Sequence, residues 1–170
     1  GAIGLHRHIP VLAVGALVMA AAVVAFLPFN FPRAKMFLGD VGSYFLGAWI
    51  AVLVIVGIRH HVEWEVMVAP VALYLADTGS TIVRRTLHGE RFYEAHREHA
   101  YQRLVTSGWS HPQVTGLVSA VIALSCLLAS LTLVVHSVVM PVGADTAMVA
   151  ITGAYLRLPA ILSATRSPEA

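Results

Sequence analysis

The stretch Phe31-Pro-Arg-Ala-Lys-Met-Phe-Leu-Gly-Asp-Val-Gly-Ser-Tyr-Phe-Leu-Gly47 places one carboxylate, Asp40, in a short polar break between two long uncharged runs. A carboxylate beside an apolar helix is costly, so its default interpretation is ion or substrate binding. Gly39 and Gly42 allow a ligand to approach the backbone, and Ser43 is expected to cap the helix that follows. The stretch therefore predicts part of a site for Mg²⁺ and phosphate, although a helix cap or a solvated loop would also explain an Asp beside Gly.

The composition favours a bilayer as the solvent of this chain. Of its 170 residues, 58% are hydrophobic and only 12% are charged, whereas soluble domains carry about 25% charged residues. The single cysteine, Cys126, lies in an apolar run and excludes a disulfide framework and a cysteine-based metal site. We expect no nucleic-acid partner.

Hydrophobic runs of membrane-spanning length recur along the chain. About 20 apolar residues cross a bilayer as a helix. Five runs qualify, the last of them weakly: residues 10–29, 41–58, 66–83, 114–140 and 147–158. The fifth is broken by Arg157 and Pro159, and residues 141–145 are interpreted as a turn before it. The pattern predicts an all-α polytopic membrane bundle of four or five transmembrane helices, forming a single membrane domain over residues 1–170.

The basic residues predict the orientation of the chain. Arg33 and Lys35 lie in the connection at about residues 30–41, and five arginines lie in the connection at about 84–113. The number of spans between these two loops places them on one side of the membrane, and the positive-inside rule makes that side the cytoplasm. Asp40 and the second loop are therefore expected to share one aqueous surface of the inner (plasma) membrane.

The second polar loop contains Glu94-Ala-His-Arg-Glu-His-Ala-Tyr-Gln-Arg103. If this segment is helical, His96, His99 and Arg103 line one face and form a surface suited to a diphosphate. A zinc site is a weaker interpretation, because no third good ligand is close by. An amphipathic helix whose basic side contacts lipid headgroups is a further alternative.

Asp77 is the one acidic residue inside the third hydrophobic run. It stands two helical turns before Arg84, so the two side chains are expected on one side of the helix, where an ion pair is possible. We favour structural support over direct chemistry for Asp77.

Two motifs resemble those of a known family. Phe37-Leu-Gly-Asp-Val-Gly-Ser43 is similar to the Phe-Met/Leu-Gly-Asp-x-Gly-Ser signature of the polyprenyl-phosphate N-acetylhexosamine-1-phosphate transferases, and His96-Arg-Glu-His-Ala-Tyr-Gln102 resembles their His-rich cytoplasmic loop. The resemblance covers about residues 10–140. It implies a membrane fold of ten or eleven helices, of which this chain would be a fragment.

The resemblance also implies an activity. In that family the phosphate of a polyprenyl (undecaprenyl) phosphate attacks the β-phosphorus of a UDP-N-acetylhexosamine, UMP leaves, and a lipid-linked glycan such as O-antigen is begun. Mg²⁺ would be the cofactor, with Mn²⁺ as an alternative, and a homodimer is compatible with the sequence.

The resemblance assigns roles to particular residues. Asp40 would bind the metal as a catalytic residue, with Gly39, Gly42 and Ser43 shaping its loop. His96 and His99 would be catalytic residues that contact the diphosphate. Three further substrate-binding residues are proposed on charge: Lys35, Arg97 and Arg103.

One departure from the family pattern decides how the chain is interpreted. The family's Asp-Asp motif and Asn-rich motif, both upstream of the signature, are not present in this sequence. We therefore expect the C-terminal half of the enzyme, inactive without the missing N-terminal half. Two rivals are half of a transporter or channel that uses Asp40 and Asp77, and a non-catalytic truncated membrane protein.

Overall fold

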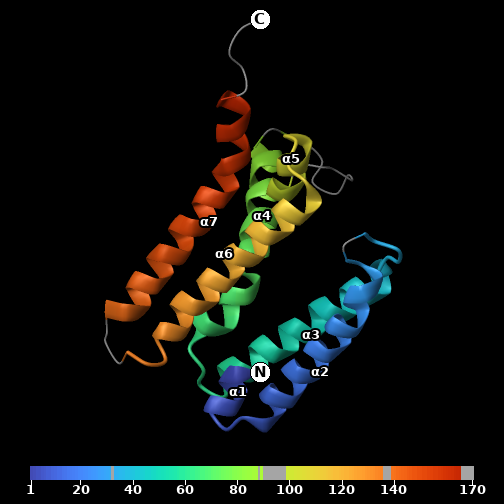
Figure 1. Cartoon of the computed structure of the whole chain (residues 1–170). Coiled ribbons are helices and arrows are strands. Elements are labelled where there is room, and N and C mark those ends of the chain that lie inside the picture. Colours follow the sequence, from blue (N-terminus) through green and yellow to red (C-terminus); the bar gives the residue numbers. More distant parts are fainter. Residues whose placement is uncertain (32, 88, 90–98, 136–138, 166–170) are drawn as a thin grey trace, which may run out of the picture. The chain divides into compact units, whose positions relative to one another are not determined.

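The structure is a computed structural model that describes residues 1–31, 33–87, 89, 99–135 and 139–165. All regular elements in this part of the chain are helices. The chain divides into two compact units, Gly1–Met67 and Val68–Ala170 (Figure 1).

The first unit is a helical hairpin preceded by a short helix. Its elements are α1 (Ala2–His6), α2 (Pro10–Phe26), the 3-10 helix η1 (Leu27–Phe29) and α3 (Gly39–Arg59). Helices α2 and α3 pack closely at Gly15, whose carbonyl oxygen accepts a 3.0 Å hydrogen bond from Trp49 Nε1. A Cβ atom on Gly15 would lie 2.9 Å from Leu53 Cδ2, so the absent side chain allows the helices to approach.

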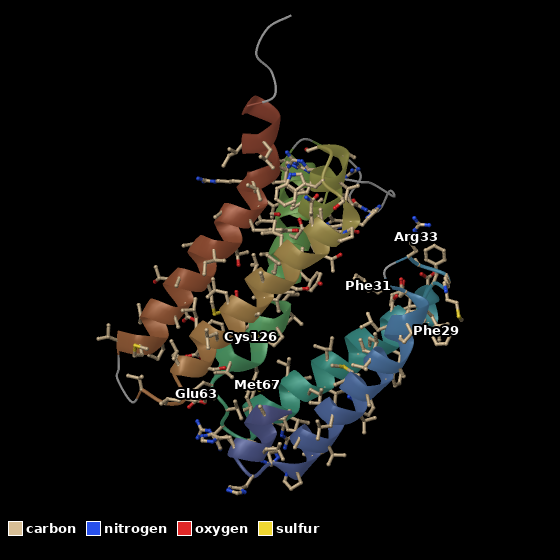
Figure 2. The ribbon with its side chains drawn as sticks, in the orientation of Figure 1. Phe29, Phe31, Arg33, Glu63, Met67 and Cys126 are labelled. Atoms are coloured by element: carbon tan, nitrogen blue, oxygen red, sulfur yellow. The ribbon has the colours of Figure 1, made fainter. Side chains whose placement is uncertain are left out.

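An ion pair joins the residue after α1 to the residue before α4. Arg7 Nη2 is 2.6 Å and 2.8 Å from the two carboxylate oxygens of Glu63, the residue just before α4. The connection that contains Phe29, Phe31 and Arg33 lies at the opposite end of the hairpin (Figure 2). The segment leading to Asp40 is therefore separated from Glu63 by the full length of α3.

The second unit surrounds a short helix with three long ones. Its elements are α4 (Trp64–Leu87), which begins within the first unit, α5 (Ala100–Thr106), α6 (His111–Leu131) and α7 (Val139–Thr165). Side chains from all four helices form the core: Leu73, Ala100, Leu104, Val114 and Tyr155. Leu104 of α5 is fully buried there, which places α5 beside the long helices.

Among the residues that the structure describes, five helices are long and apolar enough to cross a membrane: Pro10–Phe29, Gly39–Arg59, Trp64–Leu87, His111–Leu131 and Val139–Leu162. Most of their side chains are not buried inside the chain, as expected for helices whose apolar surface faces lipid. The all-α membrane bundle predicted from the sequence is thereby confirmed, at the upper end of the predicted helix number.

The boundary between the last two spans was wrong in the prediction. The run at 114–140 ends as a helix at Leu131, and the residues interpreted as a turn, 141–145, belong to α7. Pro141 is the third residue of α7, where the backbone has no N–H partner to lose, so proline is tolerated. The weak fifth run at 147–158 is therefore the middle of a complete helix.

Candidate functional site

Asp40 lies at the very start of α3 rather than in a loop. Helix α3 begins at Gly39, whose φ of +70° is in the region that glycine adopts at little cost. Asp40 is exposed in the first turn, where the helix dipole favours a negative charge. Apart from its chain neighbours and the adjoining backbone of α3, no described atom lies within 4 Å of the position that a Cβ on Gly39 would occupy. Lys35 is also exposed.

The predicted cap by Ser43 was wrong. Because α3 begins four residues earlier, the Ser43 hydroxyl lies within the helix and donates to the Gly39 carbonyl oxygen at 2.9 Å. At Gly42, a Cβ atom would come within 2.6 Å of Leu38 Cγ. Leu38 therefore covers the first turn of α3, and the small size of Gly42 makes room for it.

His99 is held by Asp77 at the start of α5. It is the N-cap residue of α5, with φ −60° and ψ 147°, and its Nδ1 lies 3.3 Å from Asp77 Oδ2. The other oxygen of Asp77 accepts a 3.0 Å hydrogen bond from the backbone N–H of Ala100. One carboxylate from α4 thus orients the imidazole and satisfies an unpaired donor at the helix start. Nδ1 is therefore the ring nitrogen that faces Asp77.

Burial of both side chains strengthens the interaction between Asp77 and His99. The Asp77 side chain is 10% exposed and the His99 side chain 25% exposed. Screening by water is weaker for such groups than at an open surface. The support role predicted for Asp77 is therefore visible as a contact, and its partner is a predicted site residue.

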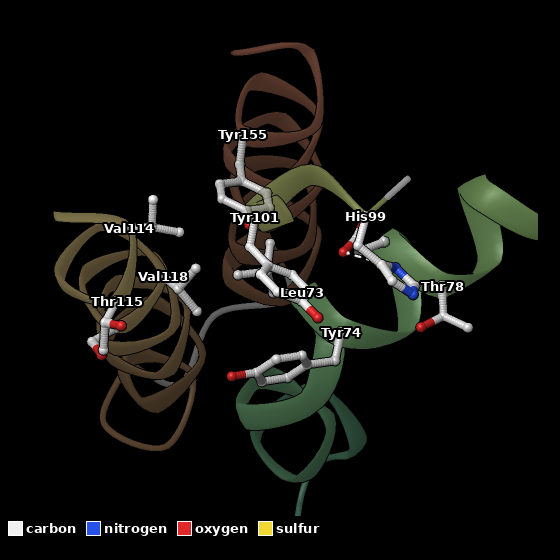
Figure 3. Close-up of a pocket in the computed structure, with 11 residues that line it drawn as sticks. Leu73, Tyr74, Thr78, His99, Tyr101, Val114, Thr115, Val118 and Tyr155 are labelled. Atoms are coloured by element: carbon white, nitrogen blue, oxygen red, sulfur yellow. Dashed lines mark ion pairs between the residues drawn. The ribbon is translucent and has the colours of Figure 1, made fainter. Parts of the chain in front are cut away.

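A pocket of ≈ 460 Å³ adjoins the Asp77–His99 pair (Figure 3). Its size is within the range of small-molecule sites, about 300–1,000 Å³. Tyr74, Tyr101 and Tyr155 line it, each from a different helix, and the Tyr101 ring is stacked near the His99 ring at a centroid distance of 5.9 Å. The pocket combines apolar walls with hydroxyl groups and, at one side, an imidazole held by a carboxylate.

His99 and Arg103 do not line one helix face as predicted. His99 has an extended backbone and precedes the helix, because its side chain and the next N–H both engage Asp77. Arg103 lines a separate cavity of ≈ 190 Å³, and of the described residues only Asp77 lines both this cavity and the larger pocket. The other two predicted residues of this segment, His96 and Arg97, lie outside the described residues.

The sequence analysis missed the pairing of Asp77 with His99 and the role of the tyrosines. Both partners had been singled out, but 22 residues separate them, and nothing in the spacing predicts the contact. Arg157, which lines the smaller cavity, had been interpreted only as a break in the fifth run. A charge inside an apolar span is itself a signal of function, and it could have identified Arg157.

The described side chains offer few ligands to a metal ion. They contain no group of three or more His, Cys, Asp or Glu residues that could hold one. Asp40 alone supplies one of the oxygen ligands that Mg²⁺ takes. Asp40 belongs to the first unit and His99 to the second, and their convergence on one ligand stays a prediction.

Comparison with known proteins identifies the family. The model of glycosyl transferase family 4 matches residues 2–58, which include Asp40 and its flanking glycines. A phospho-N-acetylmuramoyl-pentapeptide-transferase of Limosilactobacillus reuteri (strain DSM 20016) is 31% identical over 128 residues, 70% of this chain and 38% of the relative. The chain belongs to glycosyl transferase family 4. This membership agrees with the resemblance seen in the sequence motifs.

Two further relatives in glycosyl transferase family 4 act on polyprenyl phosphates by name. A probable undecaprenyl-phosphate N-acetylglucosaminyl 1-phosphate transferase of Bacillus subtilis (strain 168) is 36% identical over 56% of this chain and 27% of its own length. A decaprenyl-phosphate N-acetylglucosaminephosphotransferase of Mycobacterium tuberculosis (strain CDC 1551 / Oshkosh) is 33% identical over 60% of this chain and 29% of its own length. The chain spans less than half the length of these relatives. No solved structure matches it significantly.

Proposed function

We propose that the protein containing this chain transfers an N-acetylhexosamine 1-phosphate group from a UDP-sugar to a polyprenyl phosphate at the inner membrane. The names of the relatives support this reaction class. The observation that carries it in the structure is His99, held by the buried carboxylate of Asp77 at the edge of a pocket between membrane-crossing helices.

The reaction requires mainly that the acceptor phosphate and the donor diphosphate are positioned and that their negative charge is neutralised. A phosphate oxygen of the acceptor lipid bonds to the β-phosphorus of the UDP-sugar, and the bond from that phosphorus to the bridging oxygen breaks, releasing UMP. Such phosphoryl transfers depend on holding the groups in line and stabilising the charge on the phosphoryl oxygens. The protonated imidazole of His99, with Nδ1 fixed by Asp77, can donate from Nε2 to one of those oxygens.

We assign the 460 Å³ pocket to the acceptor lipid next to its phosphate. The pocket lies between α4, α6 and α7, and its walls are mainly apolar. Its polar side is the Asp77–His99 pair. A lipid with its first isoprene units against the tyrosines would bring its phosphate to His99.

The first unit contributes the second part of the proposed site. Asp40 would supply one carboxylate ligand to Mg²⁺ or Mn²⁺, and the open turn at Gly39 would admit the donor diphosphate. Lys35 adds a nearby positive charge, and His96 and Arg97 would act with His99. The ion-transport alternative is not favoured, because both carboxylate oxygens of Asp77 contact His99 and α5.

The test is a transfer assay on the complete protein, with undecaprenyl phosphate, a panel of UDP-N-acetylhexosamines and Mg²⁺, reading both UMP and the lipid product. His99→Ala should slow transfer about ten- to a hundredfold, the loss expected for a charge-assisted hydrogen bond to phosphate. His111→Ala is the matched control, since His111 is exposed at the start of α6 and does not line the pocket. Equal rates for the two variants would remove His99 from the site.

Asp40→Asn in the same assay should abolish UMP release over the accessible range of Mg²⁺ and Mn²⁺ concentrations. Undiminished transfer by Asp40→Asn would contradict its assignment as a metal ligand. If the unmodified protein transfers no sugar phosphate to the lipid with any donor, the proposed function is wrong.

A further inference from the structure

The smaller cavity of the second unit gathers positive charge from three helices. It has a volume of ≈ 190 Å³ and is lined by Arg84 of α4, Arg103 of α5 and Arg157 of α7. Among the described residues, its lining includes one acidic side chain, Asp77. Three arginines and a single acidic residue thus line the same cavity.

Both oxygens of that carboxylate already have partners. One Asp77 oxygen is paired with His99 and the other accepts from the N–H of Ala100. Within the described part of the chain, no carboxylate forms an ion pair with Arg103 or Arg157. Like charges that converge repel one another, so the arrangement is most favourable when an anion lies between them.

Guanidinium groups in such a setting select phosphate. Each presents paired N–H donors that match two oxygens of a phosphate group. The cavity has room for several water molecules at about 30 Å³ each, and therefore for one phosphate group. Leu156 adds an apolar wall, which suits a phosphate carried by an organic group.

Helix-end anchoring is the simpler explanation for arginines near the ends of α4 and α7, where cations are favoured by the dipole and by headgroups. Arginines that only anchor their helices would point outward into headgroups or water. Here the third arginine, Arg103, comes from the short helix α5, and all three line one cavity. Anchoring of helix ends therefore does not explain why all three arginines line the same cavity.

We propose that Arg84, Arg103 and Arg157 form a binding site for a phosphate group, separate from the pocket beside His99. The group would come either from an anionic membrane lipid or from a water-soluble phosphate compound. Because the site is defined by binding rather than turnover, it does not depend on the proposed transferase activity.

The experiment measures binding to the complete protein in nanodiscs. One arm compares phosphatidylcholine alone with mixtures that contain phosphatidylglycerol, counting bound lipids by native mass spectrometry and following thermal unfolding. The other arm titrates inorganic pyrophosphate in phosphatidylcholine nanodiscs. The variants are Arg103→Gln, Arg157→Gln and the double variant, with Arg103→Lys to keep the charge. Arg59→Gln is the matched control, since Arg59 is an exposed helix-end arginine outside the cavity.

In the unmodified protein at least one ligand should bind and raise the unfolding temperature. Each Gln substitution should weaken that binding about tenfold, Arg103→Lys should retain most of it, and Arg59→Gln should leave it unchanged. If the Gln variants lose binding in the phosphatidylglycerol arm, the ligand is a lipid headgroup. If they lose binding in the pyrophosphate arm, the ligand is a soluble phosphate compound. Binding that is unaltered in the double variant in both arms would overturn the proposal, as would the absence of binding to the unmodified protein. Unfolding in phosphatidylcholine alone shows whether each variant is folded.

Discussion

The carboxylate of Asp77 contacts two neighbours, one through each oxygen. It accepts from His99 and from the N–H of Ala100, and its residue also borders both cavities of the second unit. A buried acid with two donors is stabilised by those donors, and removing the charge leaves both of them without an equivalent partner. In the proposed site, Asp77 would therefore be a positioning residue that acts through His99 and α5.

Replacing Asp77 tests this role. Asp77→Asn should lower the free energy of unfolding by about 1–3 kcal/mol, since the amide can accept from one donor while its NH₂ group faces the other. Transfer activity should fall to a similar extent as in His99→Ala, and in the double variant the second change should add little. The measurement is a double-mutant cycle on the transfer rate, with unfolding in detergent followed in parallel.

Glu63→Gln is the control for Asp77→Asn. It also removes one carboxylate, but from a partly exposed ion pair with Arg7 in the other unit, where such pairs contribute less than about 1 kcal/mol. Fully additive effects of Asp77→Asn and His99→Ala on the rate would show that Asp77 does not act through His99.

Two serines near helix starts differ in what they stabilise. Ser110 is the N-cap of α6, where its hydroxyl accepts from the Gln113 N–H and the Gln113 side chain accepts from the Ser110 N–H. Ser43 instead lies inside the first turns of α3 and donates to Gly39. A capping box satisfies donors that the helix leaves unpaired, whereas a hydroxyl bonded to a carbonyl four residues back adds little.

Substituting each serine by alanine should separate the two roles. Ser110→Ala should lower the free energy of unfolding by about 1 kcal/mol, and Ser43→Ala should change it by less than about 0.5 kcal/mol. Both are read as shifts in unfolding by detergent denaturation. A larger cost for Ser43→Ala than for Ser110→Ala would restore Ser43 as the cap of α3.

The packing of α2 on α3 depends on one small residue. Gly15→Leu should destabilise the first unit by about 1–3 kcal/mol, because its Cβ would meet Leu53 and displace the Trp49 hydrogen bond. Gly47→Leu in α3 is the control, since beyond the adjoining backbone of α3 no described atom lies within 4 Å of its added Cβ, and it should be neutral or slightly stabilising. Thermal unfolding in detergent checks both, and equal costs would contradict the close approach at Gly15.

Periodicity and turn chemistry predicted the helices well where an apolar run ended at a charge. The runs at 10–29, 41–58 and 66–83 each match one helix to within a few residues. Periodicity and turn chemistry gave the wrong prediction at residues 141–145, because proline and glycine favour a turn in isolation but are compatible with the first turns of a helix. The start of α3 was misplaced for a related reason, because a glycine at positive φ can begin a helix before the first polar cap.

The distribution of charge predicts how the whole molecule lies in the membrane. The connection with Arg33 and the one after α4 should both be cytoplasmic, and the short connection at residues 60–63 should be on the other side. Single cysteines at Arg33→Cys, Thr106→Cys and His60→Cys, introduced into a Cys126→Ala background, test this with a membrane-impermeant thiol reagent.

In intact cells only His60→Cys should react, and all three should react after the membrane is opened. All three positions are exposed, so a lack of reaction in intact cells reports sidedness rather than burial. Labelling of Arg33→Cys and Thr106→Cys on different sides would separate Asp40 from His99 and exclude a shared site.

The sequence by itself determined that the chain lies in a lipid bilayer, that it is helical and which family it resembles, and it contains the motifs with Asp40 and His99. It could do so because apolar content, run length and short motifs are local properties of the chain. Tertiary structure alone decided that Asp77 holds His99, that three tyrosines form a pocket beside them, and that Arg157 joins Arg84 and Arg103. These contacts depend on the lengths and packing of separate helices, and the contact energy between residues far apart in the chain leaves no periodic signal in their spacing.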